Sequence, residues 1–291
     1  SGGLYEEATP DLIEAVLEEA GKLAENVIAP LNDGVDANPA KLKDKEVTTS
    51  PGFADAYRQW VEGGWGAIAG SGDYGGQGLP MALAAALQEI WNGASLSFGL
   101  CPILSQGAVE ALSAHGTDEQ REKYLAKLIS GEWTGTMNLT EPQAGSDVGA
   151  LRTRAEPNGA GSYRVTGQKI YISWGDADFA ENVCHAVLAR LPDGVPGTKG
   201  ISLFIAEKGP GFSTGRKLKK LGYKGIDSAE LVFEDYRLPA ENLIGGVPGQ
   251  GFRQTVGGLE LGRINIAARG VGVAQAALDR AVEYAQVRET M

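Results

Sequence analysis

The sequence predicts a multi-domain α and β architecture: an N-terminal helical domain, a middle antiparallel β barrel or sandwich, and the start of a C-terminal helical bundle. Ahead of Trp133, apolar residues recur every three or four positions, which is the period of an α-helix. From Trp133, short β-branched and aromatic runs alternate with Gly, Pro and Asp turns. From Gly251 the helical period returns. We therefore expect domains at 1–132, 133–245 and 246–291.

Local signals mark where the N-terminal helices begin and end. Thr9 is an expected N-cap, and Pro10 fits the first helical position because its missing N–H would have no partner there. Thr117 and Gln120 have the spacing of a capping box, which predicts a helix start. Gly116 is expected to end the preceding helix in the left-handed conformation.

Six short runs are the predicted strands of the middle domain, because each is bounded by turn residues. They are Trp133–Leu139, Ser162–Thr166, Lys169–Ser173, Asn182–Ala189, Gly200–Ala206 and Glu230–Phe233. The helix predicted after Gly251 reaches Met291 with no cap and no partner helix after it. A lone amphipathic helix cannot bury its own apolar face, so we expect the natural protein to continue.

Composition argues against several classes of function. The 291 residues carry a net charge of −11, and a nucleic-acid or anionic-membrane surface needs clustered cations. Two cysteines and two histidines, none in a ligand-spaced cluster, argue against a metal site. No apolar run approaches the ~20 residues that span a bilayer. One compact basic run, 216–220, fits either a small anionic ligand or a solvated strand edge, and the second is favoured.

Two glycine-bearing segments are candidates for ligand binding. Residues 70–75 match GxGxxG, but they follow a predicted helix end and lead into another loop, so we reject a dinucleotide fingerprint there. Residues 136–147 (TMNLTEPQAGSD) place small hydroxyls, a glycine and free backbone N–H groups after a strand. Such a turn suits the polar edge of a heteroaromatic ring and a phosphate, although most turns of this composition are only turns.

Residues 136–147 resemble the TEPxAGSD signature of the acyl-CoA dehydrogenase superfamily, and further motifs follow in family order. Residues 167–173 (GQKIYIS) are similar to its GxKxWIT strand, and 233–245 to its FxDVxVPxxNxLG stretch. Glu260–Arg263 fall on the family's arginine-bearing turn, and Arg288 begins its RxxFG element. Residues 188–204 resemble a branch that includes the methylthiopropanoyl-CoA-type enzymes.

The resemblance implies an FAD site and assigns residues to it. Residues at the end of the first predicted strand border the flavin ring, and a hydroxyl there can donate to the ring's polar edge. The glycine and serine of the turn match the pyrophosphate-binding position. The strand at 171–173 matches the wall beside flavin N5, with tyrosine and serine replacing the usual tryptophan and threonine. Two C-terminal residues match those that reach the partner subunit's FAD. In order, the cofactor residues are Met137, Leu139, Thr140, Gly145, Ser146, Tyr171, Ile172, Ser173, Arg288 and Thr290.

The resemblance also implies a CoA site and a missing base. Ser146 and the segment Glu260, Leu261, Gly262 and Arg263 match CoA-contacting positions. Arg263 is the strongest candidate, because a guanidinium makes directed contacts with anionic groups, although an ion pair with Glu260 is the alternative. Gly262 occupies the position where a minority of the family carries the catalytic glutamate. We therefore expect the base beyond Met291 and assign no catalytic residue and no metal ligand.

The function implied is α,β-desaturation of an acyl-CoA thioester, with electrons passed to an electron-transfer flavoprotein. Two alternatives stay open: an acyl-CoA oxidase or flavin monooxygenase on the same scaffold, and a non-catalytic FAD- or CoA-binding fragment. We expect a homo-oligomer, dimer or tetramer, with no nucleic acid and no membrane span. The bacterial cytoplasm is favoured over the mitochondrial matrix, and the present chain alone is expected to be inactive.

Overall fold

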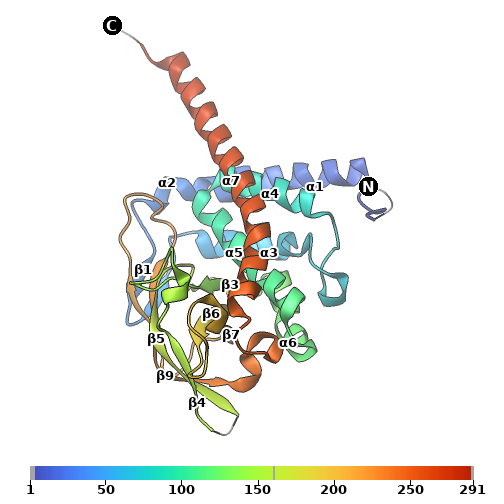
Figure 1. The fold of residues 1–291 in the computed structure, drawn as a ribbon. Helices are drawn as coiled ribbons and strands as arrows, with labels where there is room; N and C mark the ends of the chain where they lie inside the picture. Colours follow the sequence, from blue (N-terminus) through green and yellow to red (C-terminus); the bar gives the residue numbers. More distant parts are fainter. Residues whose placement is uncertain (1–3, 160, 290–291) are drawn as a thin grey trace.

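The computed structural model describes residues 4–159 and 161–289. Its N-terminal part is helical, and a short hairpin of β1 (Lys41–Lys43) and β2 (Glu46–Thr48) interrupts the helices (Figure 1). The helices are α1 (Pro10–Leu23), α2 (Asn32–Val35), α3 (Phe53–Glu62), α4 (Met81–Ala94), α5 (Leu96–His115) and α6 (Asp118–Ser130).

The predicted caps of α1 and α6 are confirmed, whereas the predicted end of α5 is wrong. The Thr9 hydroxyl accepts the Leu12 N–H at 3.3 Å. Thr117 and Gln120 form the reciprocal capping box. Gly116 is extended (φ −65°, ψ 154°) rather than left-handed, because it leads straight into the extended N-cap residue of the next helix.

A seven-stranded curled sheet forms the middle of the molecule, in the order β3-β6-β4-β5-β9-β8 with β7 on β6. It is mixed rather than wholly antiparallel, because β3 runs parallel to β6 and β4 meets β6 in one parallel pair. The strands are β3 (Trp133–Asn138), β4 (Arg154–Pro157), β5 (Ser162–Ser173), β6 (Asn182–Arg190), β7 (Ile201–Ala206), β8 (Phe212–Lys217) and β9 (Ser228–Pro239).

An aromatic cluster joins the helices to the end of β5. Trp174, which directly follows β5, lies 4.8 Å from the Phe53 ring of α3, centroid to centroid. Phe179 contacts both rings, and Phe98 of α5 lies 5.5 Å from Phe53. Because Trp174 is only 1% exposed, the end of β5 is fixed against the helical layer.

The last helix, α7 (Gly251–Val287), crosses α4 and α5 and then projects from the molecule (Figure 1). The crossing with α4 is close because both helices carry glycine there. A Cβ added to Gly272 would lie 2.1 Å from the Glu89 carbonyl oxygen, and one added to Gly93 would lie 3.2 Å from the Gly272 oxygen. Beyond the crossing, α7 exposes several apolar side chains: Leu278, Val282, Tyr284 and Val287.

Candidate flavin and CoA site

A tight turn follows β3 at the centre of the predicted signature. The N–H of Glu141 donates to the Ala144 oxygen at 2.8 Å, and the Ala144 N–H returns a bond to Glu141 at 3.0 Å. Met137, Leu139 and Thr140 ahead of this turn are half-buried. The two hydrogen bonds therefore fix the backbone between Glu141 and Ala144, and the residues directly after Ala144 are exposed.

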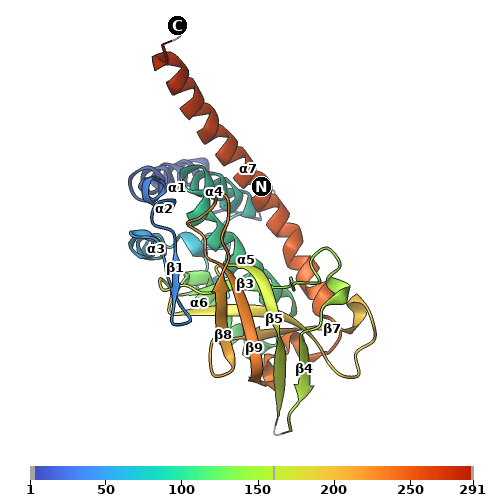
Figure 2. The ribbon, with the colours of Figure 1, turned by 90° about the vertical axis from the view of Figure 1, so that its left-hand side faces the viewer.

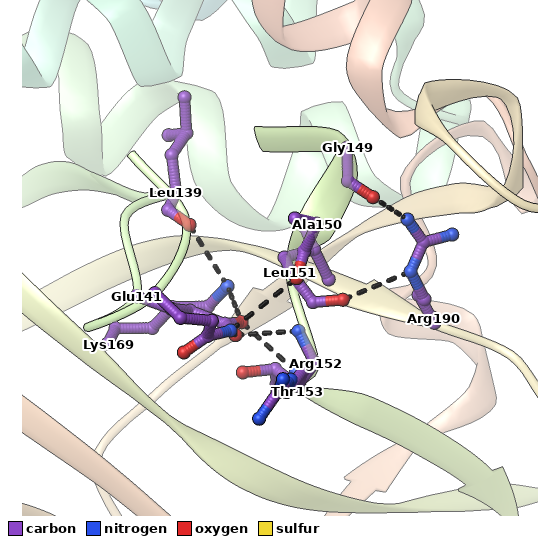
Figure 3. A network of polar contacts seen from close by, with 10 residues as sticks. Leu139, Glu141, Gly149, Ala150, Leu151, Arg152, Thr153, Lys169 and Arg190 are labelled. Carbon is purple, nitrogen blue, oxygen red and sulfur yellow. Dashed lines mark hydrogen bonds and ion pairs between the residues drawn. The ribbon is translucent and has the colours of Figure 1, made fainter. Parts of the chain in front are cut away.

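A buried ion pair anchors the turn to β5 (Figure 3). The Lys169 ammonium lies 2.8 Å from Glu141 Oε1, and the two side chains are 0% and 3% exposed. Lys169 also donates to the Leu139 oxygen at 3.2 Å. Glu141 accepts the backbone N–H groups of Arg152 and Thr153 at 2.6 and 3.0 Å. A buried charge pair is tolerated when its remaining donors and acceptors are satisfied, and here Glu141 accepts backbone N–H groups while Lys169 has a second acceptor.

The charges of this pair are set by opposing effects. Burial acts to raise the pKa of Glu141, but the Lys169 charge and the hydrogen bonds outweigh it and lower the pKa to about 2. Burial lowers the pKa of Lys169 to about 8, against the opposing effect of Glu141. At neutral pH both groups therefore stay charged, and the anchor is intact.

The turn and the strand predicted to face the same ring lie side by side. The Ile170 N–H donates to the Thr140 oxygen at 2.9 Å. The Thr136 hydroxyl donates to the Ser173 oxygen at 2.9 Å. These two bonds bracket the Tyr171–Ser173 segment and bring it against the end of β3.

A β-bulge in β5 turns one of the predicted residues outward. The register with β9 shifts between Lys169 and Ile172, and Tyr171 has a positive φ of 60°. Its ring is 67% exposed, while Ile172 beside it is 3% exposed. Bulges of this kind re-aim a side chain at the edge of a functional site. Tyr171 is thus an exposed aromatic residue directly after Ile170, whose backbone is bonded to the turn.

The residues after the turn fit the phosphate-bearing part of a cofactor. Gly145 and Ser146 are exposed, and their N–H groups, with that of Asp147, donate to no other described residue. Free backbone N–H groups are donors that an anion can accept from. The Thr140 hydroxyl also has no bond to a described residue and is available as a donor. The residues present therefore fit a flavin nucleotide.

Arg190 holds the chain that follows the turn (Figure 3). Its guanidinium donates to the carbonyl oxygens of Gly149, of Leu151 at 3.1 Å and of Gly197 at 3.0 Å. One side chain on β6 thus links the loop after the turn to the loop before β7, because its donors form a rigid fork.

The predicted CoA segment lies on α7, over α5. Asn265 donates to the Gln106 side-chain oxygen at 2.8 Å, and Gly258 packs on the Gly107 oxygen. Gly107 also neighbours Met137, since a Cβ there would lie 3.7 Å from the Met137 sulfur. Leu261 and Gly262 are half-buried, and Glu260 and Arg263 are exposed. Among the described residues Glu260 and Arg263 form no ion pair, so the Arg263 guanidinium is open to an incoming group.

The structure does not bring Arg288, one of the two C-terminal residues predicted to serve a cofactor, to this site. Arg288 directly follows α7, where the helix has projected away from the turn (Figure 1). Thr290 lies outside the described residues. Their predicted contact with the FAD of a partner subunit stays a prediction.

Sequence reasoning missed the residues that support the site. Glu141 and Lys169 both lie inside the quoted motifs, yet neither was singled out. A charged residue in an otherwise buried strand is a signal for a buried partner. The pairing of Asn138 with His185 was also missed: they lie 3.1 Å apart, amide nitrogen to Nδ1, and are 0% and 2% exposed. Burial lowers the pKa of His185 to about 3, which keeps the ring neutral.

Family models match almost the whole chain in the expected order. The N-terminal domain of acyl-CoA dehydrogenase matches residues 11–132, the middle domain 136–236, and the C-terminal domain 249–291. The chain belongs to the acyl-CoA dehydrogenase family. Members of this family use FAD, which agrees with the fit of the turn.

Named relatives of this acyl-CoA dehydrogenase chain act on different thioesters. It is 39% identical to the 3-methylmercaptopropionyl-CoA dehydrogenase of Ruegeria pomeroyi, over 98% of the chain and 50% of that protein. It is 37% identical to the mitochondrial isovaleryl-CoA dehydrogenase of Pongo abelii, over 96% and 65%. The chain thus spans about half to two thirds of the length of these relatives.

Solved structures share the fold. The butyryl-CoA dehydrogenase of Megasphaera elsdenii superimposes with a TM-score of 0.83 at 29% identity, covering 97% of this chain and 71% of that one. A glutaryl-CoA dehydrogenase in complex with glutaryl-CoA gives 0.83 at 28%, covering 97% and 68%. The three-part architecture of the acyl-CoA dehydrogenase fold, predicted from the sequence, is therefore confirmed.

The described residues contain neither a membrane-spanning helix nor a cluster of metal ligands. No helix there is long and apolar enough to cross a membrane. In the same part of the chain, no three His, Cys, Asp or Glu side chains gather as metal ligands would.

Proposed function

We propose that the protein containing this chain is an FAD-dependent acyl-CoA dehydrogenase that desaturates an acyl-CoA thioester and passes electrons to an electron-transfer flavoprotein. One observation supports this most strongly. Ile170, directly ahead of the segment Tyr171–Ser173, is hydrogen-bonded to Thr140 of the turn, and Ser173 is bonded to Thr136 of β3, beside free N–H groups and a free hydroxyl. That arrangement, on a chain of this family, suits a flavin nucleotide.

The chain's own residues have distinct proposed roles toward FAD. Met137 and Leu139 border the ring, and the Thr140 hydroxyl donates to its polar edge. Gly145 and Ser146 hold the pyrophosphate through backbone N–H groups, and Tyr171–Ser173 form the wall beside it. Arg288 and Thr290 serve the FAD of a partner subunit in a dimer or tetramer. When bound, FAD supplies the acceptor for the two electrons that leave the substrate as hydride.

The substrate's half of the site is proposed on α7 and the turn. Ser146 and the segment Glu260–Arg263 contact CoA, and Arg263 contributes a directed cation. Desaturation breaks two C–H bonds: a carboxylate takes the α-proton, and the β-hydrogen leaves with its electron pair while the C=C bond forms. Gly262 cannot act as that base. We propose that the catalytic base lies beyond Met291. We also propose that residues 1–132, 133–245 and 246–291 are separate domains. The bacterial cytoplasm is the proposed location.

A spectral titration of the complete protein tests this function. We expect a yellow protein whose flavin absorbance bleaches under anaerobic conditions with a preferred thioester. The series should include 3-methylmercaptopropionyl-, isovaleryl- and butyryl-CoA, because relatives are named for these. A preparation that takes up no flavin would contradict the proposal. Rapid oxygen consumption by the reduced protein would favour an oxidase or monooxygenase, and flavin binding without bleaching a non-catalytic protein.

The role of Thr140 has its own test. Replacing it with valine removes a hydrogen bond to the reduced, negatively charged ring, worth about 1.5–3 kcal/mol. We expect the two-electron midpoint potential to fall by roughly 30–60 mV. Thr140→Ser keeps the hydroxyl and should stay near the parent value. Equal midpoint potentials for the valine and serine variants would contradict a hydrogen bond from the Thr140 hydroxyl to the flavin ring.

A further inference from the structure

β8 and the β1 hairpin are neighbours at the outer edge of the sheet (Figure 2). A basic groove lies between them. Its volume is about 630 Å³, within the range of small-molecule sites. Its walls come from two chain segments and one further lysine: residues 39–42, residues 215–220 and Lys224. We call this the basic groove.

The charge of the basic groove is the reverse of the protein's. Six of its eleven lining residues are cationic and none is acidic, on a chain with a net charge of −11. Gathering like charges costs free energy, and in a concave site the field is focused inward. The cations are Lys41, Arg216, Lys217, Lys219, Lys220 and Lys224.

Few of these cations are neutralised by the protein. Arg216 pairs with Glu230, and Lys224 lies 3.5 Å from Asp36. Lys217 and Lys220 donate only to neutral oxygens, of Ala40 and of Ile226 and Ser228.

Two further lysines have no acceptor. Lys41 and Lys219 form no hydrogen bond or ion pair with any described residue. Burial and then the Lys217 charge lower the pKa of Lys220 to about 8, against the opposing charge of the buried Asp227 carboxyl, which accepts no hydrogen bond from either lysine. An anion in the groove would relieve that repulsion.

Protection of a strand edge does not account for this charge. β8 is the last strand on its side of the sheet, and exposed lysines commonly block pairing with another chain. Here, however, the β1 hairpin already packs along β8, and Lys217 donates to Ala40 across the junction. The charges line a hollow between covered elements rather than a bare edge.

The groove also has apolar walls. Pro39, Leu42 and Leu218 line it together with the cations. Lysine ammonium groups bind phosphate as point charges, and the volume leaves room for more than a free phosphate. We propose that the basic groove binds a small phosphate ester of nucleotide size, with its phosphates on the lysines and its base or other body on the apolar wall.

This site is separate from the proposed flavin wall. Lys217 pairs with Ala229 of β9, which pairs in turn with Ile172 of β5. One complete strand therefore separates the groove from the wall, and none of the groove residues is assigned to FAD or CoA.

Calorimetric titration of the FAD-saturated protein with ATP tests the proposal. We expect saturable binding that weakens as ionic strength rises, because ion pairs are screened. Lys41→Gln combined with Lys219→Gln should weaken it about tenfold or more, since two charge-assisted contacts are lost. Neither side chain has a structural partner, so the fold should be kept. Pyrophosphate alone should bind more weakly than ATP.

The matched control is Lys43→Gln with Arg237→Gln, which removes two exposed cations outside the groove and should leave ATP affinity unchanged. Absence of ATP binding would overturn the proposal. So would ATP binding that the groove variant does not weaken, because the nucleotide would then sit elsewhere. Groove variants that slow electron transfer to an acceptor protein, without ATP binding, would assign the surface to a protein partner instead.

Discussion

The pKa values of two buried carboxylates in the middle domain shift in opposite directions. Glu141 is paired with Lys169 and accepts backbone N–H groups, and its pKa falls to about 2. Asp227 is 0% exposed and neither of its oxygens has a hydrogen bond of good geometry; burial, together with the nearby charge of Asp176, raises its pKa to about 7 despite the charges of Lys217 and Lys220. A direct ion pair with Lys169, together with hydrogen-bond donors, therefore keeps Glu141 charged, and Asp227 has no such ion pair.

The largest expected effect comes from breaking the Glu141 anchor. Glu141→Ala leaves the Lys169 ammonium buried without its partner, and we expect a loss of about 3–5 kcal/mol in the free energy of unfolding. Chemical denaturation at pH 7 measures it. The control is Glu14→Ala, at an exposed carboxylate, which should change stability by less than about 0.5 kcal/mol. A small loss for Glu141→Ala would mean that the pair is not needed.

The next effect concerns pH. Asp227 has a folded pKa above its unfolded value, so its stabilising contribution is present below about pH 4 and is lost as pH rises through about 7. Asp227→Asn removes this dependence. We expect the variant to match the parent near pH 4 and to exceed it above pH 8 by a few kcal/mol. If the stability of the parent does not fall relative to that of the variant between pH 4 and pH 8, the raised pKa of Asp227 is refuted.

Glu141 predicts the reverse sign. Its folded pKa lies below the unfolded one, so its contribution is present above about pH 4.5 and disappears as pH falls through about 2.

Replacing both partners of the anchor should cost far less than replacing one. Glu141→Leu with Lys169→Met removes both charges and fills the space, and such exchanges are often neutral or stabilising. We expect the double variant to recover most of the loss seen for Glu141→Ala, apart from the orphaned N–H groups of Arg152 and Thr153. If the double variant is as unstable as the single one, the contribution of the Glu141–Lys169 pair to stability comes from packing rather than from its charges.

The smallest expected effect sharpens the account of Asp227. Lys220→Gln removes one of two cations that lower its pKa, so the midpoint should rise by less than about one unit. Carboxyl NMR of labelled protein measures it, and a midpoint that falls would contradict the assigned interaction. Lys224→Gln is the control, because Lys224 does not act on this pKa.

Much of the fold was accessible from sequence because helix caps and turn residues act locally. The capping box at Thr117 and the six strand runs depend on neighbours in sequence. The parallel pairing of β3 with β6, the extended Gly116 and the strands β4 and β8 depend on distant partners, which one sequence does not display. β5 joins two predicted strands into one, through bulges that no propensity reveals.

The candidate site likewise has features that the sequence indicates and features that depend on distant residues. Thr140 and Ser146 were found through a family resemblance, and their own chemistry alone would have left them an ordinary turn. The outward position of Tyr171 follows from a positive φ, which is rare for a tyrosine and invisible in the sequence. The Glu141–Lys169 pair joins residues 28 positions apart, and the sequence does not show which distant residue each of them contacts.

The part of α7 beyond its crossing with α4 at Gly272 projects as one rigid helix, so a small rotation at the crossing moves its far end a long way. From Gly272 to Val287 the helix extends about 22 Å at 1.5 Å per residue. A rotation of about 10° at the crossing would displace the tip by roughly 4 Å. Since a Cβ at Gly272 would collide with the Glu89 backbone, substitution there would re-aim Arg288 without touching it. The direction in which this arginine points is thus set some four turns away, by the absence of a single methyl group.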